Sequence, residues 1–160
     1  ANLLLDENLV VKIADFGVAR TKPTDGSRMT AETGTYRWMA PEVIAHQYYD
    51  EKADVFSYGV MVWELVSGGE VPYPGYTPLQ AAVGIVQRGL RPTISPSVHP
   101  VIAQVMQYCW NDDPAARPSM EQIITLLRNI DVPRQQEGKH GFLDRLRSVS
   151  FKSKKSTRSQ

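Results

Sequence analysis

The sequence predicts a mostly α-helical fold with a short β-hairpin near its start. Residues 54–66 are apolar on nearly every side of a helix, which is typical of a helix inside a core. Shorter stretches with apolar residues at helical spacing follow, between loops that are rich in proline and glycine. With 160 residues, of which 42% are hydrophobic, the chain has enough apolar material for one ordinary core.

The predicted hairpin lies at the start of the chain. The apolar runs Leu3–Leu5 and Leu9–Ile13 flank the polar triplet Asp6–Asn8, which is typical of two strands around a turn. Residues 14–39 then show neither helical nor strand periodicity, and such a long connection usually has a functional reason. Pro41–Ala45 can make one helical turn, with proline near its start.

The later helices have recognisable boundaries. Asp54 is placed to cap the start of the first long helix, and Ser67-Gly68-Gly69 ends it. Thr77-Pro78 opens the next helix, and Ser119 with Gln122 forms a capping box for the last. The apolar stripes expected on the three later helices are Leu79, Ala82, Val83 and Val86; Val101, Ile102, Val105 and Cys109; and Met120, Ile123, Ile124 and Leu127.

Charge divides the chain into two parts. Of its 18 lysines and arginines, 8 lie in residues 134–160, together with only 2 of the 17 acidic residues. We therefore expect a globular domain over residues 1–133 and a basic, serine-rich, disordered tail over 134–160. The tail is either simply solvated or attracted to an acidic partner or a membrane surface, and nucleic acid is not an expected partner. The single cysteine, Cys109, favours a reducing compartment, so we expect a cytoplasmic protein.

The stretch between Asp15-Phe16-Gly17 and Ala40-Pro41-Glu42 carries the strongest motif. A β-branched run, Val10–Ala14, precedes it, and Gly34–Met39 leads directly into Ala40. D-F-G followed by A-P-E, in this context, resembles the protein kinase superfamily from residue 1 to about residue 131. The residues in and around these motifs are most similar to those of the tyrosine-kinase-like group, in particular the plant Raf-like serine/threonine/tyrosine kinases. The segments that carry this likeness are A-D-F-G-V-A-R, M-T-A-E-T-G-T-Y-R-W-M-A-P-E-V, K-A-D-V-F-S-Y-G-V, T-P-L-Q-A-A-V-G and C-W…D-P…R-P.

This resemblance implies the C-terminal lobe of the protein-kinase fold, a protein substrate, and ATP and Mg²⁺ as cofactors. Asp15 matches the aspartate of D-F-G, a hard oxygen ligand for Mg²⁺. Asn2, which by itself is typical of a turn, matches the asparagine that ends the catalytic loop and binds the second ion. Leu4 corresponds to the residue under the adenine ring, although an apolar strand residue needs no such role.

The resemblance also implies structural roles. It pairs Glu42 with Arg117, a link between the end of the long loop and the helical body. It gives Asp54 a second role, holding the backbone of the catalytic loop, which is compatible with capping. Phe16 is interpreted as a packing residue that couples the position of the loop to the active state.

Hydroxyl groups in the loop are candidate control points. Thr30 and Thr33 are the first candidates for phosphorylation and Ser27 the third, because a phosphate can order a loop by pairing with arginine. Each of them can equally be a turn hydroxyl. Thr35 resembles the hydroxyl that serine/threonine kinases place against the catalytic base, so specificity for serine and threonine is the first expectation and dual specificity the second.

The kinase pattern also extends upstream of Ala1. The catalytic aspartate of H-R-D-L-x-x-x-N would lie five residues before Asn2, so it has no counterpart in this chain, and neither has the N-terminal lobe. We therefore expect the chain alone to be inactive and to depend on that lobe as a partner in the parent protein, with apolar surface exposed where the lobe would pack. The alternative function is a pseudokinase or docking module that signals by binding.

Overall fold

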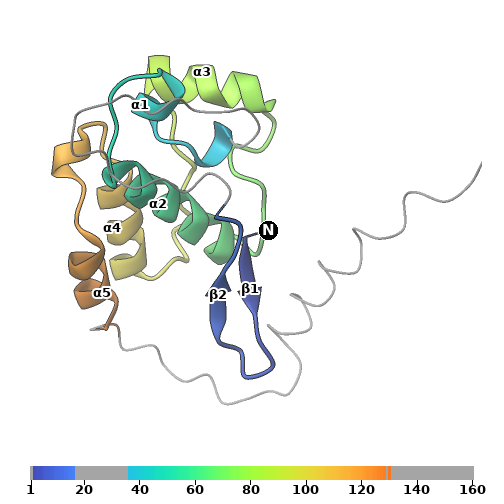
Figure 1. Ribbon diagram of the computed structural model, residues 1–160. Helices are drawn as coiled ribbons and strands as arrows, with labels where there is room; N and C mark the ends of the chain where they lie inside the picture. Colours follow the sequence, from blue (N-terminus) through green and yellow to red (C-terminus); the bar gives the residue numbers. More distant parts are fainter. Residues whose placement is uncertain (1, 17–35, 129, 131–160) are drawn as a thin grey trace, which may run out of the picture. The chain divides into compact units, whose positions relative to one another are not determined.

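Two short strands and five α-helices make up the described part of the chain, which comprises residues 2–16, 36–128 and 130 of a computed structural model (Figure 1). The strands are β1 (Leu3–Leu5) and β2 (Val11–Ile13), and the helices are α1 (Pro41–Ile44), α2 (Lys52–Val66), α3 (Pro78–Arg88), α4 (Pro100–Cys109) and α5 (Met120–Arg128). Two 3₁₀ turns, η1 (Tyr36–Trp38) and η2 (Pro114–Ala116), complete the order. The predicted class, mostly helical with one small hairpin, is confirmed. No helix in these residues is long and apolar enough to cross a membrane.

The predicted hairpin is present, and Asp6 organises its turn. β1 and β2 pair antiparallel, with Leu3 opposite Ile13 and Leu5 opposite Val11. One carboxylate oxygen of Asp6 accepts hydrogen bonds from the backbone amides of Asn8 and Val10, both at 2.9 Å. These two bonds allow the turn to close although Leu9 has a positive φ of 63°, which side-chain-bearing residues rarely adopt.

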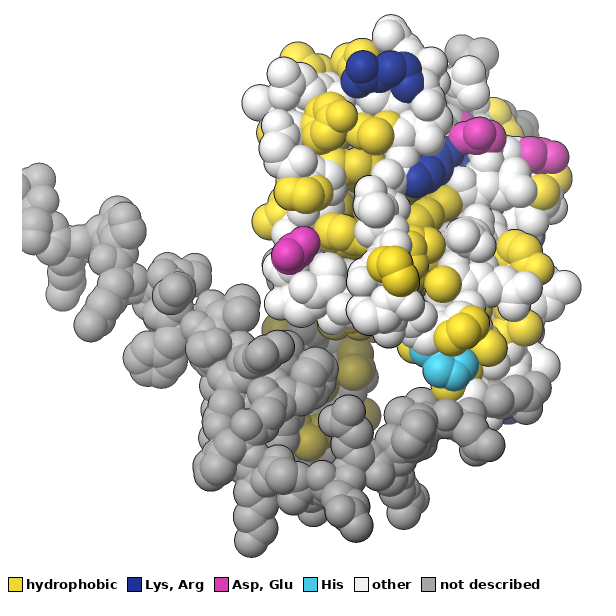
Figure 2. Space-filling model, turned by 180° about the vertical axis from the view of Figure 1, so that it is seen from behind, with side chains coloured by type: hydrophobic (Ala, Val, Ile, Leu, Met, Phe, Trp, Pro, Cys, Tyr) yellow, Lys and Arg dark blue, Asp and Glu magenta, His cyan; other side chains and the backbone are white. Residues whose placement is uncertain are grey.

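The hairpin keeps its apolar side chains exposed on both faces. The seven large apolar residues of Leu3–Ile13, together with Phe16, have exposed fractions between 42% and 69%. Elsewhere, too, the described surface shows hydrophobic side chains with few charged groups among them (Figure 2). An exposed apolar surface of this extent is typical of a face that another part of a protein covers.

Helix α2 forms the centre of the helical body, and α4 lies alongside it (Figure 1). Val55, Phe56 and Val60 of α2 are buried against Val105 and Met106 of α4 in the core cluster. The approach is close at Gly59, where an added Cβ would come within 2.6 Å of the Cβ of Cys109. The buried central helix is confirmed, except that its last residues, Leu65 and Val66, are exposed.

The prediction that Asp54 caps α2 is wrong. The helix begins earlier, at Lys52, with Glu51 at the cap position in helical geometry. A side-chain oxygen of Asp50 accepts the amide hydrogen of Lys52 at 2.9 Å and so satisfies one of the orphan donors at the helix start. The C-terminal end is as expected: Gly68 and Gly69 both have positive φ, and the amide of Gly69 donates to the carbonyl of Glu64.

Helix α3 starts at the predicted place but buries a different face. Thr77 and Gln80 form a full capping box, and Gly89 ends the helix with φ of 59°. The face turned toward the core consists of Ala81, Ala82, Gly84 and Ile85. Of the predicted stripe only Ala82 is buried, whereas Leu79, Val83 and Val86 are exposed. The buried face therefore carries small side chains, and Gly84 lies against the residue just after the helix: a Cβ there would meet the Leu90 side chain at 2.8 Å.

The last two helices largely follow the prediction. Val105 and Cys109 of the α4 stripe are buried, and Val101 and Ile102 are partly buried. The capping box of α5 is confirmed, since the amide of Ser119 donates to the side chain of Gln122 at 2.8 Å and the amide of Gln122 donates back at 3.3 Å. On α5 only Ile123 is fully buried, while Met120 and Ile124 remain exposed.

Candidate functional site

The open end of the hairpin brings together the two residues predicted to bind metal. The register that places Leu3 opposite Ile13 continues for one more residue, because the amide of Ala14 donates to the carbonyl of Asn2 at 2.9 Å. Asp15 follows immediately, with a left-handed φ of 66°. Asn2 and Asp15, thirteen positions apart in the numbering, therefore lie at the same end of the sheet, and both are exposed.

The other residues expected at this site lie along the same hairpin or outside the described residues. Leu4 is opposite Lys12 in the middle of the sheet, with 53% of its surface exposed. Phe16 is 68% exposed, so no packing role is visible for it in the described residues. The hydroxyl candidates Ser27, Thr30, Thr33 and Thr35 all lie outside the described residues.

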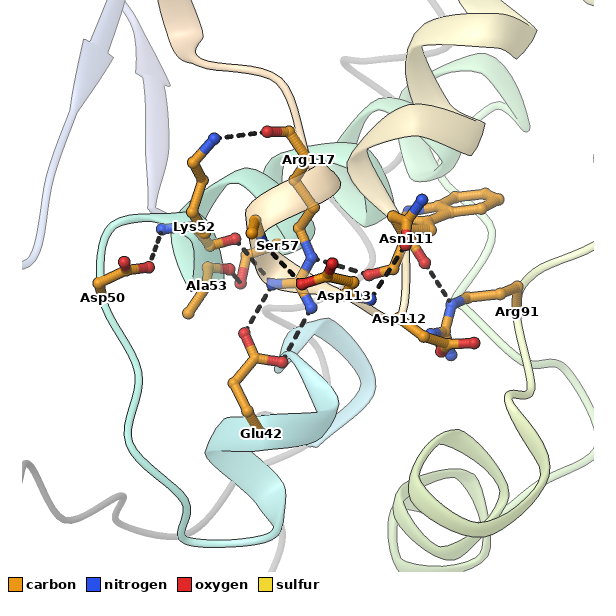
Figure 3. A network of polar contacts seen from close by, with 12 residues as sticks. Glu42, Asp50, Lys52, Ala53, Ser57, Arg91, Asn111, Asp112, Asp113 and Arg117 are labelled. Atoms are coloured by element: carbon orange, nitrogen blue, oxygen red, sulfur yellow. Dashed lines mark hydrogen bonds and ion pairs between the residues drawn. The ribbon is translucent and has the colours of Figure 1, made fainter.

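A buried ion pair joins α1 to the segment before α5. Glu42 is 6% exposed and Arg117 is 1% exposed, although they are far apart in the sequence. Their contact is bidentate: Nη1 of Arg117 donates to Oε1 of Glu42 at 2.6 Å, and Nη2 donates to Oε2 at 2.9 Å (Figure 3). This fork geometry is the strong form of an arginine–carboxylate contact. The structure thus brings together the two residues that the resemblance paired.

The guanidinium group of Arg117 donates two further hydrogen bonds. Nε donates to the carbonyl of Asn111 at 2.9 Å, and Nη1 also donates to the carbonyl of Lys52 at 2.9 Å. In return, the ammonium group of Lys52 donates to the carbonyl of Arg117 at 2.5 Å (Figure 3). The guanidinium group also lies over the ring of Phe56, 5.2 Å from its centroid. Arg117 therefore links α1, the start of α2 and the loop after α4 through hydrogen bonds from one side chain.

A second arginine, which the sequence analysis did not single out, extends this network. Arg91 lies over the same Phe56 ring at 4.9 Å. It donates to the carbonyl of Trp110 at 3.0 Å and forms an ion pair with Asp112. The ring of Phe56 is thus in contact with two cations. The sequence of α2 indicated only that Phe56 is an apolar core residue.

Asp54 lies in the first turn of α2, where the residue is accessible to solvent but its carboxylate is partly shielded by neighbouring atoms. Partial burial of the carboxylate raises its pKa, and the nearby negative charge of Glu51 raises it further. Its predicted contact with a catalytic loop involves a segment upstream of Ala1. The pKa of Asp54 is therefore above that of an ordinary aspartate in this structure.

Arg37 and Trp38 form a third group, for which the sequence predicted no structural contact. The guanidinium group of Arg37 donates to the carbonyls of Pro72, Tyr73 and Tyr76, at 2.6, 3.1 and 2.5 Å. The indole of Trp38 donates to Glu64 of α2 at 3.0 Å. Together they fix η1, directly before Ala40, to α2 and to the loop that precedes α3. Their position between Gly-Thr and Ala-Pro-Glu was the available signal, but nothing in the sequence names their acceptors.

Comparison with known proteins agrees with this organisation. A sequence profile of the family described as "Protein tyrosine and serine/threonine kinase" matches residues 1–127. The serine/threonine-protein kinase STY46 of Arabidopsis thaliana is 59% identical over 138 residues, which are 86% of this chain and 24% of that protein. The serine/threonine-protein kinase STY17 of the same plant is 55% identical over 145 residues, or 88% of this chain and 25% of that protein.

The name of a more distant relative also includes tyrosine. The serine/threonine/tyrosine-protein kinase HT1 of Arabidopsis thaliana is 38% identical over 130 residues, which are 81% of this chain and 33% of that protein. The chain therefore spans about a quarter to a third of the length of these relatives. Since the family profile covers most of the chain and the described fold is a mostly helical body with one hairpin, the chain belongs to the protein tyrosine and serine/threonine kinase family.

Proposed function

We propose that the protein containing this chain transfers the γ-phosphoryl group of ATP to serine and threonine hydroxyls of proteins. The observation that carries this proposal is the hydrogen bond from the amide of Ala14 to the carbonyl of Asn2, which holds Asn2 and Asp15 at one end of the hairpin. The family membership and the names of the relatives support the same activity. Tyrosine is the second acceptor to test, because the name of HT1 includes it.

The two residues at the open end of the hairpin suit Mg²⁺. Asn2 offers an amide oxygen and Asp15 a carboxylate. Hard oxygen ligands of this kind coordinate Mg²⁺ in proteins that bind nucleotide phosphates. Both residues are exposed. The bound ions would neutralise charge that develops on the phosphoryl group. This chain would contribute the donor atoms and, through the hairpin, their fixed spacing.

Other contributions of the chain follow from the family pattern. Thr35 would place its hydroxyl against the catalytic base, and Leu4 would lie under the adenine ring. Phosphorylation of Thr30 or Thr33, or thirdly of Ser27, would order the loop before Ala40. Phe16 would pack when the loop reaches its active position. The N-terminal lobe of the same domain would be the partner of the exposed hairpin, and a cytoplasmic location and an acidic partner or membrane surface for residues 134–160 stay predictions.

A phosphotransfer assay tests the proposal directly. The parent protein, extended upstream through the N-terminal lobe, is given radiolabelled ATP, Mg²⁺ and a serine-containing peptide. Asp15→Ala should lower kcat at least ~100-fold, because the Mg²⁺ ion that neutralises charge in the transition state would lose a protein ligand. Asn2→Ala should lower kcat less. Glu7→Ala is the matched control, because it removes a carboxylate from the turn at the opposite end of the same hairpin, and it should leave kcat unchanged.

The same assay decides between the two candidate functions. Full activity in folded Asp15→Ala would remove the metal-ligand role. A folded wild-type parent that transfers no phosphate to serine, threonine or tyrosine would overturn the enzyme and leave the alternative, a pseudokinase that signals by binding. The chain 1–160 by itself should be inactive, because none of its residues matches the catalytic aspartate of the family pattern.

A further inference from the structure

Helix α3 presents an apolar strip to solvent, which consists of Leu79, Val83 and Val86. These side chains are 66%, 42% and 41% exposed. Their spacing of four and three positions places all three on one face of the helix. The small residues of α3 occupy the opposite face, which packs on η1 and α1. Within the described residues, the large apolar side chains of α3 therefore lie on its solvent side, which is typical of a surface that binds another protein.

The α3 strip carries no charge. Its polar neighbours on the exposed side of the helix are Gln80 and Gln87, and the one charged residue of α3, Arg88, is its last. A helix face that is exposed in a single molecule normally carries charged side chains. A charge-free face offers no attraction to an acidic or basic partner, and it can pack against a copy of itself without burying unpaired charge.

A hollow borders the strip near the end of α3. Its volume is about 350 Å³, and Val86 and Gly89 line it together with Ala45 and Tyr48. Leu79 is the most exposed residue of the strip and lies seven positions before Val86. Seven positions correspond to about two helical turns, or roughly 10 Å along the axis. The helix thus has a protruding side chain near its start and a hollow near its end.

We propose that α3 is a self-association surface, on which a second copy of this protein packs its own α3 in the antiparallel direction. A two-fold axis near Val83 would bring Leu79 of each copy against Val86 and the adjoining hollow of the other. Both protruding side chains and both hollows are then used at once, and a two-fold interface requires such reciprocal contacts. Because the strip is small, the dimer is weak and forms only at raised concentration. The inference does not depend on the proposed activity, because it concerns association alone.

Sedimentation velocity over a range of concentrations tests this association. The parent protein is used, extended upstream through the N-terminal lobe, so that the exposed hairpin does not itself drive association. The wild type should shift from monomer to dimer as its concentration rises. Val83→Glu and Val83→Lys should each raise the dissociation constant at least ~100-fold, because two like charges would meet near the axis. Neither change should unfold α3, since glutamate and lysine are better helix formers than valine.

The matched control is Ile124→Glu. It places the same charge at a similarly exposed apolar position of α5, where Ile124 is 47% exposed, and should leave association unchanged. An equal loss of association in this control would overturn the inference, because the effect would then come from charge anywhere on the surface. A wild type that stays monomeric at every concentration would also overturn it.

A mixture of the two Val83 variants shows whether position 83 meets its own copy. Equimolar Val83→Glu and Val83→Lys should associate again, because the glutamate of one copy then faces the lysine of the other, whereas mixing does not repair a damaged fold. No recovery in the mixture would overturn the inference and leave the strip to a protein of different sequence.

Disulfide formation tests the direction of packing. Leu79→Cys mixed with Val86→Cys should give a crosslinked dimer of the two variants on oxidation, and the buried Cys109 should not compete. Efficient crosslinking within Leu79→Cys alone would overturn the antiparallel arrangement.

Discussion

Arg117 is the residue on which the buried polar contacts converge. Its guanidinium group donates to both carboxylate oxygens of Glu42 and to the carbonyls of Lys52 and Asn111, so a charge that is almost fully buried has an anionic partner and four hydrogen bonds. Removing one partner of such a pair leaves an uncompensated charge, whereas an exposed pair contributes little. The chain offers both cases, because Lys12 and Asp6 form an exposed pair at 3.5 Å.

Glu42→Gln in the chain 1–160 should therefore lower the free energy of unfolding by about 3 kcal/mol or more. Lys12→Gln, the matched control, should change it by less than about 1 kcal/mol. Urea denaturation followed by tryptophan fluorescence measures both. Equal small losses for the two variants would mean that water reaches the Glu42–Arg117 pair.

Asp54 should make stability depend on pH in an unusual direction for an aspartate. Burial and the charge of Glu51 raise its pKa in the folded state, so the folded protein holds this proton more tightly than the unfolded chain does. The resulting stabilisation is present at low pH and is lost as the pH rises through the folded-state pKa.

Asp54→Asn should therefore raise the urea midpoint at pH 7 and leave it unchanged near pH 3, where the carboxyl group is protonated in both states. Glu121→Gln should show the opposite sign at pH 7, because hydrogen bonds from its own backbone amide and from Ser119 lower the pKa of Glu121. In the extended parent, Asp54→Asn should also lower activity if Asp54 holds the catalytic loop. A lower midpoint for Asp54→Asn at pH 7 would contradict this account.

At the scale of elements, the contact between α2 and α4 depends on the absence of a side chain at Gly59. A Cβ there would lie 2.6 Å from the Cβ of Cys109 and 2.7 Å from the indole nitrogen of Trp110. Neither atom is the far end of a flexible side chain, so the two helices would have to separate. Burial in this contact also raises the pKa of the Cys109 thiol to about 12, which keeps it protonated and unreactive.

Gly59→Ala should therefore lower the free energy of unfolding by about 1–3 kcal/mol, although alanine is the better helix former by up to about 1 kcal/mol. Gly84→Ala in α3 is the comparison: its new Cβ would lie 2.8 Å from Cδ2 and 3.2 Å from Cβ of Leu90, and because the closest of these atoms is the end of a side chain, we expect a smaller loss than for Gly59→Ala. Thermal unfolding compares the two variants. A stabilised Gly59→Ala would show that α2 and α4 pack less closely than described.

At the scale of the whole molecule, local patterns predicted the elements well and long-range geometry poorly. The hairpin turn and the capping box at Ser119 depend on residues a few positions apart, so the sequence contains all the information needed. The stripe on α3 failed because the face that packs on η1 and α1 consists mostly of small residues, Ala81, Ala82 and Gly84, which apolar size does not single out. The start of α2 failed because Asp50, four positions before Asp54, satisfies the helix end instead.

In the candidate site, too, the long-range contacts could not be predicted from local sequence patterns. The Glu42–Arg117 contact was available only through the resemblance, because two residues so far apart give no periodic signal. The acceptors of Arg37 are backbone carbonyls, which every residue possesses, and the two cations on Phe56 come from separate loops. Such contacts become visible only when the chain is folded.

The distance along the chain between Glu42 and Arg117 also has a kinetic meaning. Their side chains are separated by 75 positions, so closing the pair costs loop entropy, and we expect it to form only after α2 and α4 have packed together. An interaction absent from the transition state changes the rate of unfolding and leaves the rate of folding almost untouched. For Glu42→Gln we expect nearly the whole loss of stability in the unfolding arm of a chevron plot. The ion pair would then determine how long the native state persists, and have little effect on how quickly it forms.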